Sequence, residues 1–154
     1  MKDETGSGKK DTLAAISETL QGDQYARFVG IRIVRIEKGY AQTELTVVDH
    51  MLNFNNVAHG GVIFSLADVA FAAACNSYNQ TSVALSFHIV YRKPIKLGTR
   101  LVAEAKEESA GKNTSLYTIA VKTDEGRLVA LCEGLAYKLQ SKVVDIDNDG
   151  PEAI

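Results

Sequence analysis

The hydrophobic positions of the chain follow two different periods, and each period predicts its own kind of element. Near the N-terminus, Leu13, Ile16 and Leu20 lie at the spacing of a helix, which predicts a short amphipathic helix with Asp11 as its N-cap. Further on, the apolar residues fall in two β-rich runs that Lys38 and the following glycine separate. This second pattern predicts a β-hairpin.

The most apolar segment of the chain runs from Val62 to Cys75, and it predicts a helix that is buried on nearly every side. The segment is rich in Ala, Leu and Phe and is longer than an ordinary strand, so we expect a helix from about Gly61 to Ser77. Four strand-like runs follow it, separated by turn-forming residues, at about 81–92, 99–109, 113–123 and 127–139.

An α+β fold is the economical packing of these elements. We expect an antiparallel sheet of about six strands, with its last four strands as a meander and one face laid against the single central helix. The 154 residues suffice for one domain with its own core. We place this domain at 11–140, after a disordered segment at 1–10 and before an acidic, flexible tail at 141–154.

Composition and charge exclude several classes of partner. The formal net charge of −2 gives no field that would draw the chain to nucleic acid. The apolar run is too short to span a bilayer, and the N-terminal residues lack the apolar core of a signal peptide. Cys75 and Cys132 lie far apart and are typical of small buried residues in a reducing compartment. We therefore expect a cytoplasmic protein that binds neither nucleic acid nor membrane.

Asp68 is the only ionisable residue between Gly60 and Cys75. It lies about two turns inside the predicted helix, so it is no N-cap, and burying an unpaired carboxylate costs several kcal/mol. It faces either solvent at a gap in the packing or a ligand cleft, and we favour the cleft. At the helix start, Gly60 and Gly61 offer free backbone N–H groups, a partial positive charge and room for a carbonyl oxygen. This start is suited to stabilise an oxyanion.

The distance between these two features indicates a shared site. Gly60 and Asp68 are separated by eight residues (68 − 60), which is about 12 Å along a helix. One chain therefore cannot hold a carbonyl at Gly60 and attack it with its own Asp68. Two copies related by a two-fold axis would bring the helix start of one subunit to Asp68 of the other.

The segment Asn53–Asp68 carries the pattern NxxxxxHGGxxFxLAD, followed by AFAAACN and later by YRKPIKLGTRLVAEA. This combination resembles the hotdog-fold thioesterases, and most of all the phenylacetate-degradation (PaaI-like) branch of the acyl-coenzyme A thioesterases. The resemblance covers roughly 25–139 in element order. It implies a long helix wrapped by an antiparallel sheet, homodimers whose two sheets join, often a homotetramer, and a thioester bound at the dimer interface.

The resemblance also implies a role for four residues of the segment. Asp68 matches the catalytic carboxylate, acting as a general base on water or as a nucleophile. Gly60 matches the backbone N–H that polarises the thioester carbonyl. Asn53 matches a polar residue that positions the thioester or the water, and His59 matches a residue that orients the loop. The hydroxyl that some relatives carry on the next strand is absent, because Ala84 stands there.

Basic residues form a second candidate group. Arg92, Lys93, Lys96 and Arg100 cluster around a turn, and Lys112 lies in another turn. They are either an ordinary solvated rim or, as a group, contacts for the phosphates of coenzyme A. Coenzyme A would then be part of the substrate, and we expect no separate cofactor.

Two other chemistries are not expected. No G-x-S-x-G elbow exists, and Ser65 has no evident partner on its apolar helix, which argues against a Ser-His-Asp triad. A metal site would need several ligands to converge, and the histidines do not cluster: they are His50, His59 and His88.

The first functional hypothesis is therefore an acyl-coenzyme A thioesterase. The alternative is a non-catalytic acyl-coenzyme A-binding or regulatory module on the same fold. A hotdog dehydratase is more distant, because that branch usually carries a catalytic histidine on the central helix and none lies there.

Overall fold

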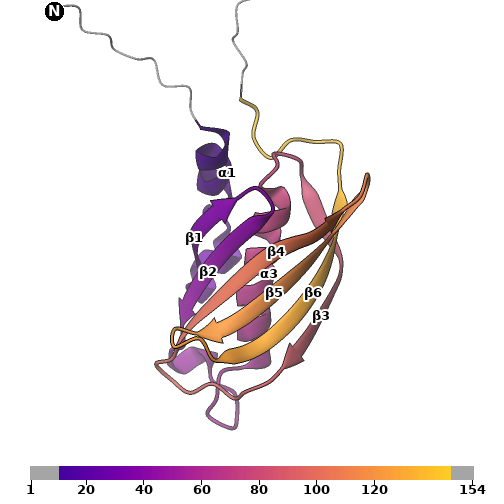
Figure 1. The fold of residues 1–154 in the computed structure, drawn as a ribbon. Helices are drawn as coiled ribbons and strands as arrows, with labels where there is room; N and C mark the ends of the chain where they lie inside the picture. Colours follow the sequence, from indigo (N-terminus) through magenta and orange to yellow (C-terminus); the bar gives the residue numbers. More distant parts are fainter. Residues whose placement is uncertain (1–10, 147–154) are drawn as a thin grey trace, which may run out of the picture.

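In the computed structural model, which describes residues 11–146, a six-stranded antiparallel sheet wraps around one long helix (Figure 1). This is the α+β hotdog arrangement that the resemblance implies, so the predicted fold class is confirmed. The predicted disordered segment at 1–10 and positions 147–154 of the predicted tail lie outside the described residues.

Most elements lie where the hydrophobic pattern predicts them. Asp11 caps the first helix, with its carboxylate accepting from the Leu13 N–H at 3.2 Å, and the central helix and the later strands are confirmed. The second short helix was not predicted. In chain order the elements are α1 (Thr12–Leu20), α2 (Gln24–Val29), β1 (Arg32–Glu37), β2 (Tyr40–Thr46), the 3-10 turn η1 (Asp49–Met51), α3 (Gly60–Asn76), β3 (Ser82–Tyr91), β4 (Arg100–Ala110), β5 (Thr114–Thr123) and β6 (Leu128–Lys138).

The strand order corrects one prediction. The sheet runs β1-β2-β4-β5-β6-β3, so only β4, β5 and β6 form a meander, and β3 pairs with β6 instead of β4. The residues between β3 and β4 cross the end of the sheet. Backbone hydrogen bonds hold this crossing in place, from the Ala58 N–H to the Ile95 carbonyl at 2.7 Å and from the Gly98 N–H to the Val47 carbonyl at 2.8 Å. The crossing leaves β3 at one edge of the sheet.

The core lies between α3 and the concave face of the sheet. Phe71 of α3 is its central aromatic, with ring centroids 5.5 Å from Tyr117 of β5 and 5.6 Å from Phe87 of β3. Gly134 of β6 makes room for this ring, since a Cβ there would lie 2.8 Å from the Phe71 Cε2 atom. The absence of a side chain at Gly134 therefore lets the Phe71 ring lie directly against the sheet.

One stripe of α3 is not covered by the sheet, contrary to the expectation of a helix buried on nearly every side. Phe64, Asp68 and Ala72 are only partly buried and Gly61 is exposed, and their spacing of three and four residues places them on one helix face. Within residues 11–146, no helix has both the length and the hydropathy to cross a membrane.

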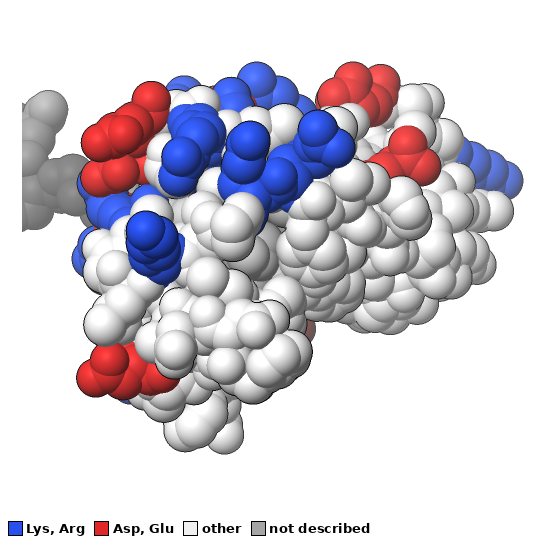
Figure 2. Space-filling model, turned by 90° about the horizontal axis from the view of Figure 1, so that it is seen from below, with Lys and Arg blue, Asp and Glu red and all other residues white. Residues whose placement is uncertain are grey.

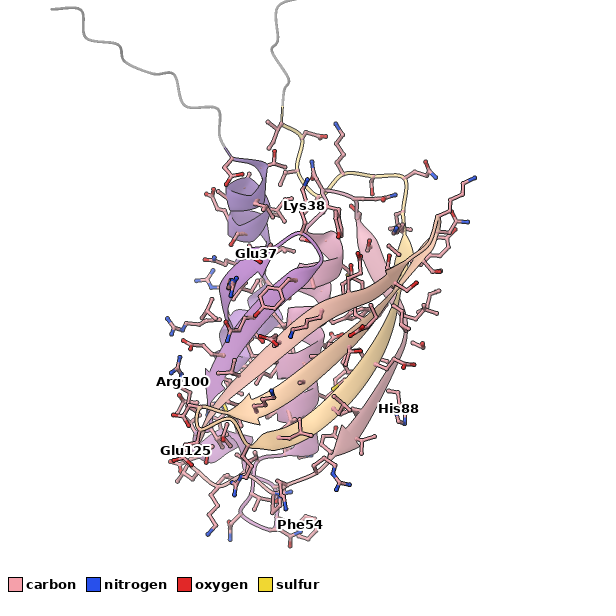
Figure 3. All side chains as sticks on the ribbon, in the orientation of Figure 1. Glu37, Lys38, Phe54, His88, Arg100 and Glu125 are labelled. Atoms are coloured by element: carbon pink, nitrogen blue, oxygen red, sulfur yellow. The ribbon has the colours of Figure 1, made fainter. Side chains whose placement is uncertain are left out.

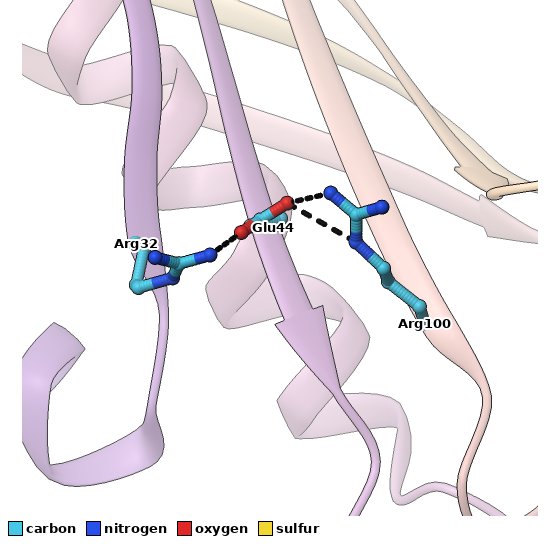
Figure 4. Close-up of polar contacts among 3 residues, drawn as sticks. All are labelled: Arg32, Glu44 and Arg100. Atoms are coloured by element: carbon cyan, nitrogen blue, oxygen red, sulfur yellow. Dashed lines mark hydrogen bonds and ion pairs between the residues drawn. The ribbon is translucent and has the colours of Figure 1, made fainter.

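A buried carboxylate ties three strands together on the outer face of the sheet (Figure 4). Glu44 of β2 lies directly opposite Arg32 of β1, and its side chain is 7% exposed. One carboxylate oxygen is ion-paired with Arg32, and the other accepts from the Nε atom of Arg100 in β4 at 3.1 Å. Both carboxylate oxygens are ion-paired, which offsets the desolvation of the buried charge.

The first part of the predicted flexible tail is bound to the domain. The Thr81 N–H donates to the Ser141 carbonyl at 2.8 Å. The side-chain amide of Asn79 donates to the Val144 carbonyl at 3.1 Å and accepts from the Val144 N–H at 3.0 Å. These contacts hold residues 141–144 against the loop between α3 and β3.

Candidate active site

The start of α3 leaves one backbone N–H without an acceptor. His59 is the N-cap, and its Nδ1 atom accepts from the Gly61 N–H at 2.9 Å. Its carbonyl accepts from the N–H groups of Val62 at 2.9 Å and Ile63 at 3.4 Å. Among the described residues, no acceptor pairs with the Gly60 N–H. A donor therefore remains at Gly60, where the positive end of the helix dipole also acts.

The contact of His59 defines the state of its ring. Because Nδ1 accepts a hydrogen bond, the proton of the neutral imidazole lies on Nε2. His59 is exposed at the end of the loop, with Nε2 free to donate. Through its bond to the Gly61 N–H, His59 fixes the first turn of α3.

Asn53 holds the loop that leads into α3. Its Oδ1 atom accepts from the backbone N–H groups of Asn55 at 2.9 Å and Val57 at 3.3 Å. Its side-chain nitrogen has no acceptor within residues 11–146 and is available as a donor. Phe54, which is 93% exposed, lies at the tip of this loop (Figure 3).

Tyr91 of β3 is a residue of this site that the sequence reasoning missed. Its hydroxyl donates to the Gly60 carbonyl at 3.0 Å. A Cβ at Gly60 would lie 3.3 Å from both the Cζ atom and the hydroxyl oxygen of Tyr91. The two residues are 31 positions apart, and no local pattern in the sequence links them.

Asp68 lies on the uncovered stripe of α3. In the described part of the chain its carboxylate has neither a hydrogen-bond nor an ion-pair partner. Burial raises the pKa of this carboxyl above its ordinary value, and the negative charge of Asp23 raises it further. A half-buried, unpaired carboxylate with a raised pKa is typical of a general base.

Ser65 has two hydrogen-bond partners that the sequence does not reveal. It is buried one turn before Asp68, and its hydroxyl donates to the Gly61 carbonyl at 2.7 Å. Its oxygen lies 2.8 Å from the hydroxyl oxygen of Tyr25 in α2. Ser65 is thus occupied in structural contacts, which agrees with the absence of a serine nucleophile motif.

The proposed carbonyl donor and the carboxylate do not meet in one chain. Gly60 begins α3 and Asp68 lies eight residues further along the same helix, about 12 Å away. Within residues 11–146, neither residue lines any of the five surface cavities described, which measure about 210–600 Å³. In a single chain the Gly60 N–H and the Asp68 carboxylate are therefore two separate groups, which are called the two half-sites below.

The structure brings three of the five basic candidates together, whereas Arg100 is ion-paired with Glu44 on the outer face of the sheet. Arg92, Lys93 and Lys96 are exposed in the crossing between β3 and β4, at the same end of the molecule as the start of α3. Figure 2 views this end, with Lys and Arg side chains gathered along one side and an uncharged area beside them. Lys112 lies in the turn between β4 and β5, at the opposite end of the sheet.

The two cysteines are unsuited to act as nucleophiles. Cys75 and Cys132 are buried free thiols, and desolvation raises the pKa of each to about 12. A thiol with such a pKa is inert. In the described ranges, no three His, Cys, Asp or Glu side chains converge as metal ligands would.

Comparison with known proteins finds an acyl-coenzyme A thioesterase and putative esterases among the relatives of this chain. The family described as the thioesterase superfamily matches residues 55–130. A putative esterase of Archaeoglobus fulgidus is 41% identical over 119 residues, which are 77% of each chain. The acyl-coenzyme A thioesterase PaaI of Escherichia coli is 37% identical over 119 residues, covering 77% of this chain and 85% of its own.

Solved structures show the same likeness in three dimensions. The structure of the E. coli PaaI protein from the phenylacetic acid degradation operon has a TM-score of 0.77 and 33% identity, over 82% of this chain and 98% of its own. A Streptococcus mutans protein bound to acetyl coenzyme A has a TM-score of 0.71 and 29% identity, over 75% and 93%.

Proposed function

The chain belongs to the thioesterase superfamily, as a PaaI-like member with the hotdog fold, and we propose that it hydrolyses acyl-coenzyme A thioesters to a free acid and coenzyme A. The E. coli relative is named as such an enzyme, and the S. mutans relative was solved with acetyl coenzyme A. The observation that carries the proposal is the unpaired carboxylate of Asp68 on the uncovered stripe of α3.

The reaction divides between the two half-sites. The thioester carbonyl oxygen accepts a hydrogen bond from the Gly60 N–H, which stabilises the negative charge that develops on this oxygen. Asp68 takes a proton from water, and the water oxygen attacks the carbonyl carbon. The tetrahedral intermediate then loses the sulfur of coenzyme A, which leaves as a thiolate and is protonated. In the other form of this proposal, the Asp68 carboxylate attacks the carbonyl carbon and displaces coenzyme A as a thiolate, and water then hydrolyses the resulting anhydride.

We propose that a homodimer completes the site. The edge strand β3 exposes apolar side chains and has no partner on one side within the described chain: Val83 is 45% exposed, Leu85 57% and Val90 42%. An unprotected apolar edge strand favours pairing with another strand. Two β3 strands joined around a two-fold axis would extend the sheet and bring Gly60 of one subunit towards Asp68 of the other. A homotetramer would be a pair of such dimers.

The basic residues fit the same arrangement unequally. Arg92, Lys93 and Lys96 lie at the end of the molecule where the thioester is proposed to bind, and they suit the phosphates of coenzyme A. Lys112 lies at the other end of the sheet and would join this group only from another subunit. A non-catalytic binding module would leave the unpaired carboxylate of Asp68 without a role.

The variant Asp68→Asn tests this assignment. It removes the base but keeps the shape of the side chain, so kcat should fall on the order of a hundredfold or more, with a smaller effect on KM. The measurement is release of free thiol from a panel of acyl-coenzyme A substrates, with size-exclusion chromatography to establish that assembly is unchanged. Near wild-type turnover of the best substrate by a well-assembled variant would contradict the role of Asp68.

A further inference from the structure

The short helix α2 is fastened to α3 by a hydrogen bond between side chains. The Tyr25 hydroxyl oxygen lies 2.8 Å from the Ser65 hydroxyl oxygen. Ser65 has one hydroxyl proton, and it donates this proton to the Gly61 carbonyl at 2.7 Å. Tyr25 must therefore donate to Ser65. The resulting series Tyr25–Ser65–Gly61 ties α2 to the first turns of α3, one turn before Asp68.

The same helix α2 begins at a carboxylate that acts on Asp68. Asp23 is the N-cap of α2, and its Oδ1 atom accepts from the Ala26 N–H at 2.9 Å. This bond fixes the carboxylate two residues before Tyr25. Within residues 11–146, Asp23 is the one charged group whose electrostatic effect on Asp68 is resolved. The thiol of Cys75, further along α3, also interacts with Asp68 but is neutral at ordinary pH.

We propose that Tyr25 and Asp23 are positioning residues of the active carboxylate: the Tyr25 hydroxyl holds α2 against α3, and α2 in turn holds the charge of Asp23 close to Asp68. This inference rests on the proposed function of Asp68. Two like charges held close together disfavour the ionised form, so Asp23 makes Asp68 a stronger base. A stronger base removes a proton from water more readily but is ionised only at higher pH.

If Asp23 served only as the N-cap of α2, replacing it with asparagine would leave the titration of Asp68 unchanged. As an N-cap, asparagine serves about as well as aspartate, so Asp23→Asn should keep α2 and remove only the charge. The chain also supplies a matched control, since Asp11 caps α1 with the same kind of bond to the Leu13 N–H. Asp11→Asn removes an equal charge from a helix start that has no resolved effect on Asp68.

The first experiment compares the pH dependence of kcat/KM for the wild type, Asp23→Asn and Asp11→Asn. We expect the acid limb of the profile to move to lower pH in Asp23→Asn and to stay in place in Asp11→Asn. High salt should move the wild-type limb in the same direction, because it screens the repulsion of an exposed charge. An acid limb that moves in neither variant, or equally in both, would overturn the inference.

The second experiment tests whether Tyr25 acts through Asp23. Tyr25→Phe keeps the ring but removes the donor to Ser65, so α2 is less firmly held and the acid limb should again move to lower pH. If the effect passes through Asp23, adding Tyr25→Phe to Asp23→Asn should give no further displacement. Displacements that add in full would show that Tyr25 does not position Asp23.

A carboxyl titration separates this inference from the proposed function. The carbon NMR signal of Asp68, assigned by its loss in Asp68→Asn, reports ionisation without any turnover. Suppose that Asp68→Asn is inactive but Asp23→Asn leaves the Asp68 titration unchanged: the inference then fails and the proposed function stands. If Asp23→Asn moves the titration to lower pH while Asp68→Asn retains activity, the proposed function fails and the electrostatic coupling stands.

Discussion

At the scale of one residue, the negative charge of Asp68 that the proposed reaction needs also destabilises the fold. Its pKa in the folded chain lies above the value of 3.8 for a free aspartate. Between these two values the folded state holds a proton that the unfolded chain has released. Stability therefore falls as pH rises through this window, and the ionised carboxylate destabilises the fold at neutral pH.

This sign gives a prediction for thermal unfolding. At pH 7, Asp68→Asn should have a higher Tm than the wild type, because the neutral amide avoids the desolvated charge. The difference should shrink as the pH falls towards 3.8, because the wild-type carboxyl takes up a proton in the folded state before it does so in the unfolded chain. Calorimetric scans of both proteins at several pH values provide the measurement. A gain that is absent at pH 7, or that grows in acid, would contradict the assigned environment of Asp68.

The residues that the sequence could identify are those whose role is local. Asp68 and Gly60 stand out because each departs from its own neighbourhood, a charge in an apolar run and a glycine at a helix start. Tyr25 and Tyr91 reach their partners across 40 and 31 positions. Such contacts depend on how α2 and β3 pack on α3, and no spacing along the chain encodes them directly.

At the scale of elements, the packing of Phe71 of α3 against the sheet depends on Gly134. A side chain at this position would meet the Phe71 ring at 2.8–3.0 Å, and Tyr117 and Phe87 enclose that ring. Gly134→Ala should therefore lower the free energy of unfolding by about 1–3 kcal/mol, the usual cost of overpacking. Urea unfolding measures the loss. Phe71→Leu is the matched second change, and the loss from Gly134→Ala should be smaller in its background.

The elements themselves were largely predictable, but their order in the sheet was not. Long periodic segments predict α3 and the strands because burial on one face imposes the period. The six-residue helix α2 is too short to show a period. The position of β3 beside β6 depends on the crossing at 92–99, whose backbone bonds join residues far apart in sequence. Strand neighbours in sequence are not always neighbours in the sheet.

At the scale of the whole molecule, the two half-sites predict that defective subunits rescue each other. One variant is Asp68→Asn. The other is Gly60→Val, whose side chain takes the room that glycine leaves for a carbonyl oxygen at the helix start. This side chain would also lie against Tyr91, but Tyr91 is 48% exposed, so its ring has room to move. Each variant alone should be nearly inactive. A mixed dimer has one site with an intact Gly60 and an intact Asp68, and one site with both lesions.

The expected recovery follows from the mixing. Random association of equal amounts makes about half of the dimers mixed, each with one working site of two, so activity should approach about a quarter of the wild type. Thioester hydrolysis after co-refolding measures this recovery, and size-exclusion chromatography of each protein serves as the control for assembly. If well-assembled mixtures stay inactive, the site lies within one chain and the shared geometry is wrong.

The hydrogen bonds between Asn79 and Val144 place the boundary of the folded unit beyond its last strand. Asn79 has a positive φ of 58° in the loop that leads from α3 to β3. A truncation after Leu139 would remove both bonds and release the turn that precedes β3. Because β3 is the strand proposed to pair with a second subunit, trimming one end of the chain would loosen the assembly as well. A protease cut or a gene fusion placed directly after β6 would therefore disturb the loop before β3 and the proposed pairing of β3 with a second subunit.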